Sequence, residues 1–328
     1  MQKILVIQTA FIGDAILSTA LLERLHSEFP KAKIDYLVRK GNESLFENHP
    51  FLNEVLIWDK SNSKYSNLWQ LLQRIRNSKY DSVFNVQRFG ASGFLTAFSV
   101  AKAKVGYDKN PFSFLFSKSV KHRFGNGFES VHEVDRVIDL FAFDSKRTNP
   151  KLHPSHKDFD KTSTLTEKPF VTIAPASVWF TKQFPAEKWI DFINQIPESL
   201  EVVLIGGPTD SELSKEIVSK VSRSIIDQTG KLKLLETSAL MKRAKMNYAN
   251  DSAPVHLASA VNAPITEVYC STVPSFGFSP LSDSSALIET AEKLDCRPCG
   301  IHGKSACPKG HFKCAKTIQT KQLLAALG

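Results

Sequence analysis

The N-terminal stretch, residues 1–38, constrains the fold more than any other part of the sequence. Residues 4–7 form an uninterrupted apolar run of the kind found in buried parallel strands. Apolar residues at helical spacing follow from residue 16 to residue 25, and a second strand is expected at residues 34–38. A strand, a helix and a second strand in this order need a right-handed crossover, so the sequence predicts a parallel sheet.

The same alternation continues through both halves of the chain. In the first half we expect strands at 55–58 and 82–85 and helices at 68–75, 93–100 and 131–141. The second half restarts with strands at 170–173, 202–205, 224–226 and 265–269 and helices at 186–196, 211–221 and 234–244.

The length of 328 residues exceeds one typical core, so two domains are expected. We predict an α/β protein with two doubly wound, Rossmann-like domains, residues 1–160 and 161–328, joined by a polar linker at 144–168. Two such domains would face each other across a cleft, and ligands of these folds bind at the carboxyl ends of the strands. The loops at those ends are therefore the candidate functional segments.

Composition narrows the class of protein and its partners. No apolar run approaches the 18 residues of a membrane span, and the opening run is too short for a signal peptide, so we expect a cytoplasmic protein. The net charge of +9 favours an anionic partner: nucleic acid, an acidic membrane face or a phosphorylated substrate. Nucleic acid is the weakest of the three, because long Lys/Arg runs and the aromatic-basic signature of an RNA-binding sheet are missing.

Residues 248–260 predict a strand, a tight turn and a helix. The turn contains Asp251 and Ser252, and Pro254 suits the first turn of the helix that follows. A helix N-terminus offers unpaired N–H groups and a partial positive charge, so this turn suits a phosphate. The alternative is an ordinary N-cap by Asp251 or Ser252.

A second loop at the end of a predicted strand, residues 174–185, offers hydroxyls at Ser177 and Thr181 and an ammonium at Lys182. Lys182 is a candidate to neutralise a diphosphate, and the alternative is a solvated surface lysine. Asp14 follows the first strand and is a candidate general base, since a carboxylate there can take a proton from an attacking hydroxyl. Its alternative role is an N-cap after the turn at Gly13.

A basic, aromatic loop interrupts the alternation at residues 110–126. Its apolar side chains have two alternative roles, in the core or against a lipid surface beside cations. They are Phe112, Phe114, Leu115 and Phe116.

Four cysteines cluster near the C-terminus as C-x2-C-x7-C-x6-C. Clustered thiols in a cytoplasmic chain suggest structural zinc before disulfides, and free or redox-active thiols are the alternative. The four are Cys296, Cys299, Cys307 and Cys314.

Several of these stretches, taken in order, resemble glycosyltransferase family nine, the bacterial ADP-heptose:lipopolysaccharide heptosyltransferases, which have the two-domain GT-B fold. The resemblance covers nearly the whole chain. It rests on residues 11–14 (FIGD) with 17–22, 174–185 (APASVWFTKQFP), 227–230 (DQTG) with 235–236, and 250–258 (NDSAPVHLA). The chain departs from the family at Ala253, where a glycine is usual, and at residues 270–274, where a Gly-Pro-Thr turn is typical.

The resemblance implies roles for individual residues. Asp14 takes the place of the family's proposed base, and Glu236 that of a residue meeting the nucleoside ribose. The expected donor-binding residues are Ser177, Thr181, Lys182, Glu236, Asp251, Ser252 and His256.

The resemblance therefore implies an inverting glycosyltransferase that moves heptose from ADP-heptose to a lipopolysaccharide inner-core acceptor. Its partners are an ADP-sugar and an anionic lipid-linked oligosaccharide, with peripheral contact to the inner membrane. No cofactor is expected to be required, and Mg²⁺ assistance stays open. The alternatives are a related enzyme using another nucleotide-sugar, or a non-catalytic two-domain ligand-binding protein.

Overall fold

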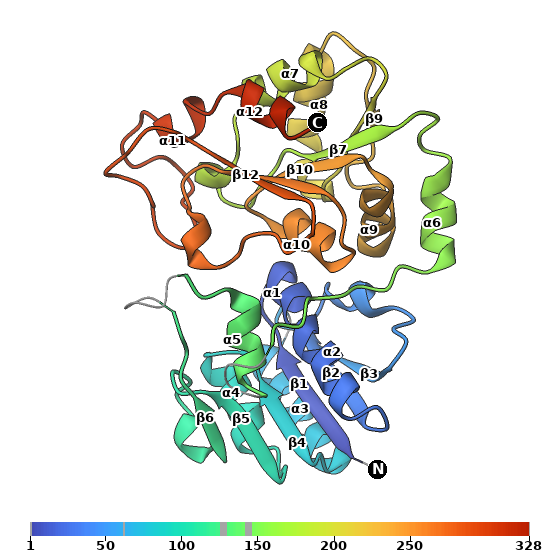
Figure 1. The fold of residues 1–328 in the computed structure, drawn as a ribbon. Coiled ribbons are helices and arrows are strands. Elements are labelled where there is room, and N and C mark those ends of the chain that lie inside the picture. The colour runs from blue at the N-terminus through green and yellow to red at the C-terminus, as the bar shows by residue number, and fades with distance from the viewer. Residues whose placement is uncertain (1, 62, 125–129, 142–145, 328) are drawn as a thin grey trace. The chain divides into compact units, whose positions relative to one another are not determined.

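The computed structural model describes residues 2–61, 63–124, 130–141 and 146–327. The chain divides into two compact units, Met1–His153 and Pro154–Gly328, which are coloured from blue to green and from green to red in Figure 1. Each is described by itself. Within the described residues each unit contains one six-stranded sheet, and every strand pair in both sheets is parallel.

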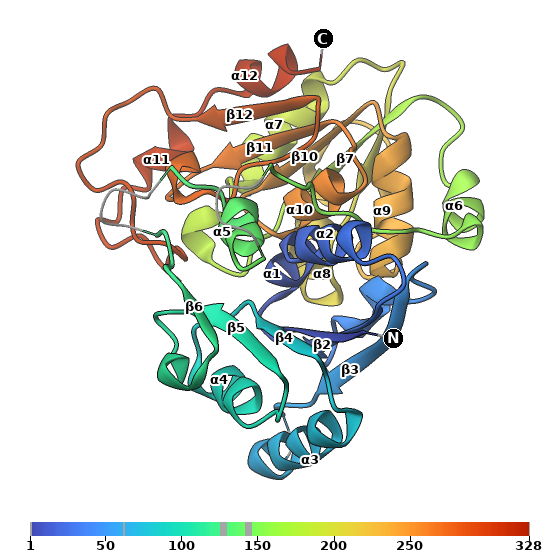
Figure 2. The same cartoon turned by 60° about the horizontal axis from the view of Figure 1, so that its bottom comes forward.

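The sheet of the first unit has the strand order β3-β2-β1-β4-β5-β6. Its strands are β1 (Lys3–Gln8), β2 (Lys33–Arg39), β3 (Leu52–Trp58), β4 (Ser82–Asn85), β5 (Ala103–Tyr107) and β6 (Lys118–Val120). Its helices are α1 (Ile12–Leu17), α2 (Thr19–Glu28), α3 (Lys64–Ser78), α4 (Gly90–Ala97) and α5 (Glu133–Asp139), with 3-10 turns η1 (Glu43–Phe46) and η2 (Ser113–Leu115). Figure 2 shows α3 and α4 on one face of this sheet and α2 and α5 on the other.

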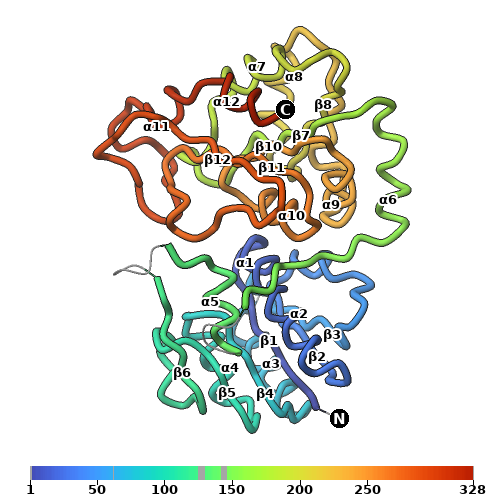
Figure 3. The backbone as a smooth tube through the Cα atoms, viewed as in Figure 1, coloured from blue at the N-terminus to red at the C-terminus, as the bar shows by residue number. Residues whose placement is uncertain are grey.

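The sheet of the second unit has the order β12-β11-β10-β7-β8-β9. Its strands are β7 (Phe170–Ala174), β8 (Glu201–Leu204), β9 (Ile226–Asp227), β10 (Met246–Asn250), β11 (Ile265–Tyr269) and β12 (Ser285–Glu289). The helices are α6 (His156–Ser163), α7 (Ala186–Gln195), α8 (Ser211–Lys220), α9 (Leu234–Arg243), α10 (Ala253–Ala260), α11 (Lys313–Lys316) and α12 (Thr320–Ala325), with 3-10 turns η3 (Phe180–Lys182), η4 (Pro208–Asp210) and η5 (Pro274–Phe276). Figure 3 traces the long irregular stretch between β12 and α11 that carries three of the clustered cysteines.

Counted within its own unit, each sheet has the order 3-2-1-4-5-6 of a Rossmann fold. The predicted fold class, two Rossmann-like α/β units, is confirmed. In such a sheet the strand order reverses between the first and fourth strands, and the crevice outside their carboxyl ends is the usual ligand site. Here those strand pairs are β1 with β4 and β7 with β10.

Buried apolar strands form the core of each sheet, which explains why they could be predicted. In β1 all five residues from Ile4 to Gln8 are buried, and all five residues of β7 are buried. The expected single helix after β1 is broken at Ser18, whose hydroxyl donates to the carbonyls of Asp14 and Ala15 at 2.9 and 3.1 Å. Such bonds from serine to the preceding turn compete with the helix ladder.

The predicted linker at 144–168 is wrong in its middle, because α6 occupies His156–Ser163. Asp158 starts this helix by accepting from the N–H and the hydroxyl of Ser155 at 2.7 and 2.6 Å. The helix packs on α9, where Arg243 donates to the carbonyl of Thr162 at 2.8 Å. The second unit therefore begins at Pro154 and not at the predicted residue 161. Residues 144–145 of the predicted linker lie outside the described residues.

The basic, aromatic loop divides its apolar side chains between two environments. Phe112 packs against Phe94 and Phe98, with ring centroids 6.3 and 6.2 Å away. Phe114, in contrast, is 77% exposed and Leu115 is 41% exposed. Residues 125–126 of the loop lie outside the described residues. Among the helices that the structure describes, none combines the length and apolar character that crossing a membrane would take.

Candidate active site

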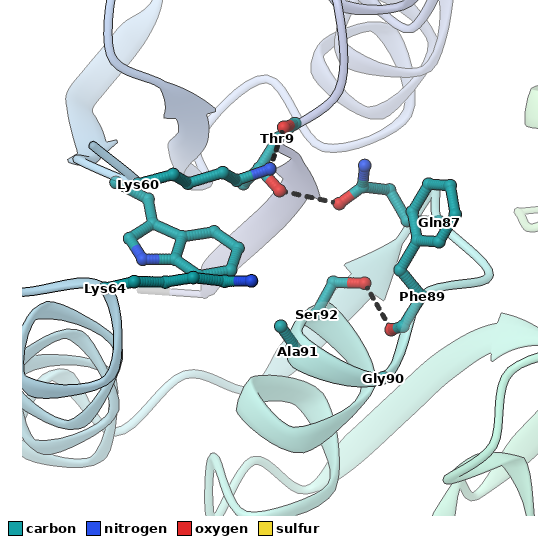
Figure 4. Close-up of a pocket in the computed structure, with 9 residues that line it drawn as sticks. Thr9, Lys60, Lys64, Gln87, Phe89, Gly90, Ala91 and Ser92 are labelled. Carbon is teal, nitrogen blue, oxygen red and sulfur yellow. Dashed lines mark hydrogen bonds between the residues drawn. The ribbon is translucent and has the colours of Figure 1, made fainter. Parts of the chain in front are cut away.

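A pocket of about 340 Å³ opens where the strand order of the first sheet reverses. Thr9 follows β1 and Gln87 follows β4, and the Thr9 hydroxyl donates to Oε1 of Gln87 at 2.8 Å. Figure 4 shows Lys60 and Lys64 entering from one side and Phe89 with the first turn of α4 closing the other. The lining consists of Thr9, Trp58, Lys60, Lys64, Gln87, Phe89, Gly90, Ala91 and Ser92.

The pocket is built to receive negative charge. The Lys60 ammonium donates to the carbonyl of Thr9 and lies 4.6 Å from the centre of the Trp58 ring, a cation–π contact. Burial, followed by repulsion from Arg39 and Lys64, lowers the pKa of Lys60 to about 8. The N-terminus of α4, with Gly90 at its first position, adds unpaired N–H groups and the positive end of the helix dipole. An anionic group in this pocket would stabilise the charged form of Lys60.

Asn110 holds the loop between β4 and α4 in place. Its amide donates to the carbonyls of Gln87 and Phe89, both at 3.1 Å, and its oxygen accepts from the N–H of Phe112 at 3.0 Å. A Cβ atom on Gly93 would lie only 2.0 Å from the Asn110 side-chain oxygen. Glycine at position 93 therefore allows the asparagine to approach the helix and fix the pocket wall.

Asp14 lies at the third position of α1, with Phe11 as the N-cap residue, so the alternative role of Asp14 as an N-cap is wrong. Burial, followed by repulsion from Glu133, raises the pKa of the half-buried Asp14 from 3.8 to about 7. Hydrogen bonds from the backbone of Phe11 and of Asp14 itself, and attraction to Arg88, oppose the shift. A carboxyl group with a pKa near 7 is well matched to general-base chemistry at neutral pH.

Asp14 and the pocket belong to one edge of the first sheet. Arg88, whose charge acts on Asp14, stands between Gln87 and Phe89, which both line the pocket.

In the second unit Asn250 joins the two strands at which the sheet order reverses. Its amide donates to the carbonyl of Pro175 at 2.7 Å, and its oxygen accepts from the N–H of Phe184 at 2.8 Å. These bonds fix the loop after β7 against the turn after β10. They bring together the two predicted donor segments, residues 174–185 and 250–258.

Lys182 and Asp251 form a buried ion pair at this point, with Nζ and Oδ2 2.8 Å apart. The same carboxylate oxygen accepts from the Thr272 hydroxyl at 2.6 Å. The two side chains are 14% and 10% exposed, so the solvated-surface alternative for Lys182 is wrong. A lysine beside the N-terminus of a helix is well placed to bind a phosphate.

The turn and helix after β10 agree with the prediction. Ser252 is the N-cap residue of α10, and its hydroxyl donates to the carbonyl of Asn250 at 3.2 Å instead of capping the helix. Pro254 stands within the first turn, and His256 is buried in the same helix. The N–H groups at the start of α10 thus have no cap from the Ser252 side chain.

The remaining predicted donor residues have structural partners in the described chain. Thr181 is buried, and its hydroxyl accepts from the Lys304 N–H at 2.8 Å and from the Ser271 hydroxyl at 3.0 Å. The carbonyl of Ser177 accepts from the Gln183 side chain at 2.6 Å. These contacts shape the loop around Lys182.

Glu236 lies at the start of α9. It accepts from the Lys233 N–H at 2.7 Å and pairs with the Lys161 ammonium at 3.3 Å. The carboxylate therefore caps the start of this helix.

The clustered cysteines influence one another but do not form a compact ligand set. The thiol of Cys314 has its pKa raised to about 11, first by burial and then by repulsion from the other three cysteines. Cys296 Sγ lies 3.8 Å from Nε2 of His311. In the described chain, no cysteine belongs to a set of three or more ligand atoms that all lie within 4.8 Å of one another. The donor chemistry suits zinc, whereas the spacing of the sulfurs does not.

Comparison with known proteins decides the family. The model of glycosyltransferase family 9 (heptosyltransferase) matches residues 68–306, which is more than half of the chain. The chain belongs to glycosyltransferase family 9. It is 26% identical over 281 residues to lipopolysaccharide heptosyltransferase 3 of Escherichia coli, covering 80% of this chain and 82% of that protein.

Solved structures of family 9 proteins share the fold. A family 9 glycosyl transferase from Veillonella parvula has a TM-score of 0.84 at 22% identity and covers 99% of this chain and 95% of its own. The ADP-heptose lps heptosyltransferase II of E. coli has a TM-score of 0.82 at 22% identity and covers 99% and 97%. The chain is thus a glycosyltransferase of the GT-B class, as the sequence predicts.

This family 9 chain also has site residues that sequence reasoning missed. Lys60 and Lys64 follow the end of a predicted strand, and this position could have marked them as candidates. Glu133, which acts on Asp14, belongs to a helix far away in the sequence, so no local pattern connects the two residues. Glu267 is fully buried within β11, where a charged residue in an apolar strand was the overlooked signal. Burial, then repulsion from Asp251, raises the pKa of Glu267 well above its ordinary value, and Lys182 opposes the shift.

Proposed function

We propose that this enzyme transfers heptose from ADP-heptose to a lipopolysaccharide inner-core acceptor with inversion at the anomeric carbon. The observation that carries the proposal is Asp14: a carboxyl group whose pKa is raised to about 7 lies at the same sheet edge as a cationic pocket. Family membership supports the reaction class, and the names of the relatives support heptose, ADP and lipopolysaccharide.

The residues of the first unit suit the acceptor. Ionised Asp14 takes the proton from an acceptor hydroxyl, and that oxygen forms the new bond to the anomeric carbon. Lys60, Lys64 and the start of α4 bind an anionic group of the acceptor and orient the hydroxyl. The positive charge of the pocket thus selects an acidic or phosphorylated sugar.

The residues of the second unit suit the donor. As the bond between the anomeric carbon and the diphosphate oxygen breaks, the electron pair leaves with ADP. Lys182 and the N–H groups at the start of α10 stabilise the added negative charge. Ser177, Thr181, Ser252 and His256 shape this pocket, and Glu236 is assigned to the ribose. Because these groups neutralise the diphosphate, we propose that transfer needs no Mg²⁺, which activity in a chelator would test.

The experiment that tests the function measures transfer with purified protein, an inner-core acceptor and ADP-, UDP- or GDP-sugars. We expect mass spectrometry to detect heptose on the acceptor with ADP-heptose, and ADP-sugars to raise the thermal midpoint most, since a ligand of the native state stabilises it. Stabilisation by ADP-heptose without product would favour a non-catalytic binding protein. Product from another nucleotide-sugar only would favour a related glycosyltransferase.

We also propose peripheral contact with a membrane. Phe114 and Leu115 are exposed, and Lys118 follows them on the surface. Exposed apolar side chains beside cations bind acidic lipid surfaces. Phe114→Ser should reduce co-sedimentation with anionic vesicles, whereas equal binding of both proteins would contradict the proposal.

For the cysteine tail we propose free thiols, because in the described chain no cysteine belongs to a compact set of ligand atoms. Added Co²⁺ should then give no charge-transfer absorption from these thiols. Such an absorption, removed by Cys299→Ser, would favour a structural metal site instead.

A further inference from the structure

Three side chains from separate segments of the first unit converge away from the pocket and Asp14. Glu23 belongs to α2, His49 follows η1, and His153 is the last residue of the unit. One carboxylate oxygen and one nitrogen from each imidazole all lie within 4.8 Å of one another. Nε2 of His153 and Oε1 of Glu23 are 3.0 Å apart. The first requirement of a metal site, convergence of ligand atoms, is therefore met.

His49 supplies the second observation. Both of its ring nitrogens are buried, and in the described part of the chain neither has a hydrogen-bond partner. Burying a polar group without a partner is costly, so buried imidazoles usually have one. Burial and repulsion from His153 lower the pKa of His49 to about 4, so its ring is neutral at pH 7. A neutral imidazole with a free lone pair is the form that binds metals.

The rings around His49 hold it in position. Phe51 meets it edge to face with centroids 4.5 Å apart, and His153 meets it in the same way at 4.6 Å. Phe46 lies beside it at 6.4 Å. An apolar shell of this kind orients a ligand and limits the access of water.

We propose that Glu23, His49 and His153 bind a divalent transition metal, with zinc the best match. Two imidazoles and one carboxylate are a familiar zinc set, and they leave a fourth position for water. Imidazole disfavours Mg²⁺ and Ca²⁺, which prefer oxygen ligands. The ion would take the place of the direct contact between Nε2 of His153 and Oε1 of Glu23.

Charged groups in and near the site determine its net charge. Glu23 contributes one negative charge, while His26 and Lys151 act on His49 as positive neighbours. One carboxylate with Zn²⁺ leaves one net positive charge, which lowers affinity relative to a thiolate site. The site differs in this way from the cysteine cluster of the second unit.

The proposed site would fix the point at which the chain leaves the first unit. His49 and His153 are far apart in sequence and converge in the folded chain, so an ion that binds both stabilises the folded state. Metal binding at this site would affect the stability of the chain and of its exit segment, whichever sugar the enzyme transfers.

The test uses the full chain, stripped with a chelator and then titrated with Zn²⁺ in a calorimeter. We compare wild type with His49→Gln and His153→Gln, and use His26→Gln as the matched control. His26 stacks on Phe51 with ring centroids 4.1 Å apart but is not one of the three ligands. We expect the control to bind as many ions as wild type and the two ligand variants to bind one fewer or at least tenfold more weakly.

Any metal bound by the cysteines would be common to all four proteins, so the comparison cancels it. With Co²⁺, the difference spectrum between wild type and His49→Gln should show metal-centred bands without thiolate charge transfer. Glu23→Gln keeps the side-chain volume and a hydrogen bond to His153 while removing the charged ligand. This variant still tests the proposal if a histidine variant fails to fold. Equal stoichiometry and affinity in wild type and Glu23→Gln would overturn the proposal.

Discussion

Asp14→Asn separates a general base from a structural carboxylate. The amide keeps the size of the side chain and can accept the hydrogen bond from the Phe11 backbone, but it cannot take a proton. If Asp14 is the base, transfer should fall by roughly 10²- to 10⁴-fold while donor binding is retained. A structural role alone would leave turnover within a few-fold of wild type.

The pH dependence follows from the direction of the pKa shift. With a pKa of about 7, Asp14 is mostly protonated at pH 6 and mostly ionised at pH 8. The ionised fraction, and with it kcat/KM, should rise roughly tenfold between these values. Glu133→Gln removes the neighbouring negative charge that raises this pKa, so the rise should move to lower pH. An unchanged profile in Glu133→Gln would contradict the assignment.

Stability supplies an independent readout. Because the pKa of Asp14 in the folded state, about 7, lies above the ordinary value of 3.8, its contribution to stability is present below pH 4 and is lost as pH rises through 7. A shift of about three pKa units corresponds to at most about 4 kcal/mol, and partial exposure reduces it. In urea unfolding, Asp14→Asn should be more stable than wild type at pH 8 and similar at pH 4. If Asp14→Asn were less stable than wild type at pH 8, the raised pKa of Asp14 would be refuted.

Three further predictions concern single side chains. Lys182→Ala should weaken ADP-heptose binding by roughly ten- to hundred-fold, since a charge-assisted hydrogen bond contributes about 1.5–3 kcal/mol, and an unchanged calorimetric Kd would contradict its donor role. Lys60→Met should raise the acceptor KM without changing donor binding, and the wild-type KM should itself rise as pH passes the Lys60 pKa of about 8. Glu267→Gln should keep transfer, because burial favours the uncharged form of the carboxyl and the amide is also uncharged. As pH rises above the ordinary value of 4.5, wild-type stability should fall more steeply than that of Glu267→Gln, since the pKa of Glu267 is raised in the folded state; parallel plots of stability against pH would refute this.

The parallel strands could be predicted because both faces of the sheet are covered, which requires nearly continuous apolar runs. The strands that sequence reasoning missed include β6 and β12, which lie at the sheet edges and are partly solvated. Edge strands contain polar residues and so lose the apolar signal. The polar helix α6 was mistaken for linker because among its residues Thr162 alone is buried.

The candidate site could be predicted only where its residues are contiguous. Each proposed donor segment follows a strand, so each could be predicted from its own loop sequence. Their contact through Asn250 could not, because predicting it requires knowing which strands are neighbours in the sheet. The raised pKa of Asp14 depends on Glu133, more than a hundred residues away, and on burial, which a sequence does not display. The convergence of Glu23, His49 and His153 is equally long-range.

The charges around Lys182 show why a buried glutamic acid is compatible with a diphosphate site. Lys182 is paired with Asp251, and both charges act on the pKa of Glu267: Asp251 raises it and Lys182 lowers it. With Glu267 neutral, one ammonium and one carboxylate balance, and the N–H groups at the start of α10 keep the local potential positive. If Glu267 were ionised, two carboxylates would face one ammonium and would repel the phosphates. The fully buried position of Glu267 in β11 disfavours that ionised form, which suits the donor site proposed around Lys182.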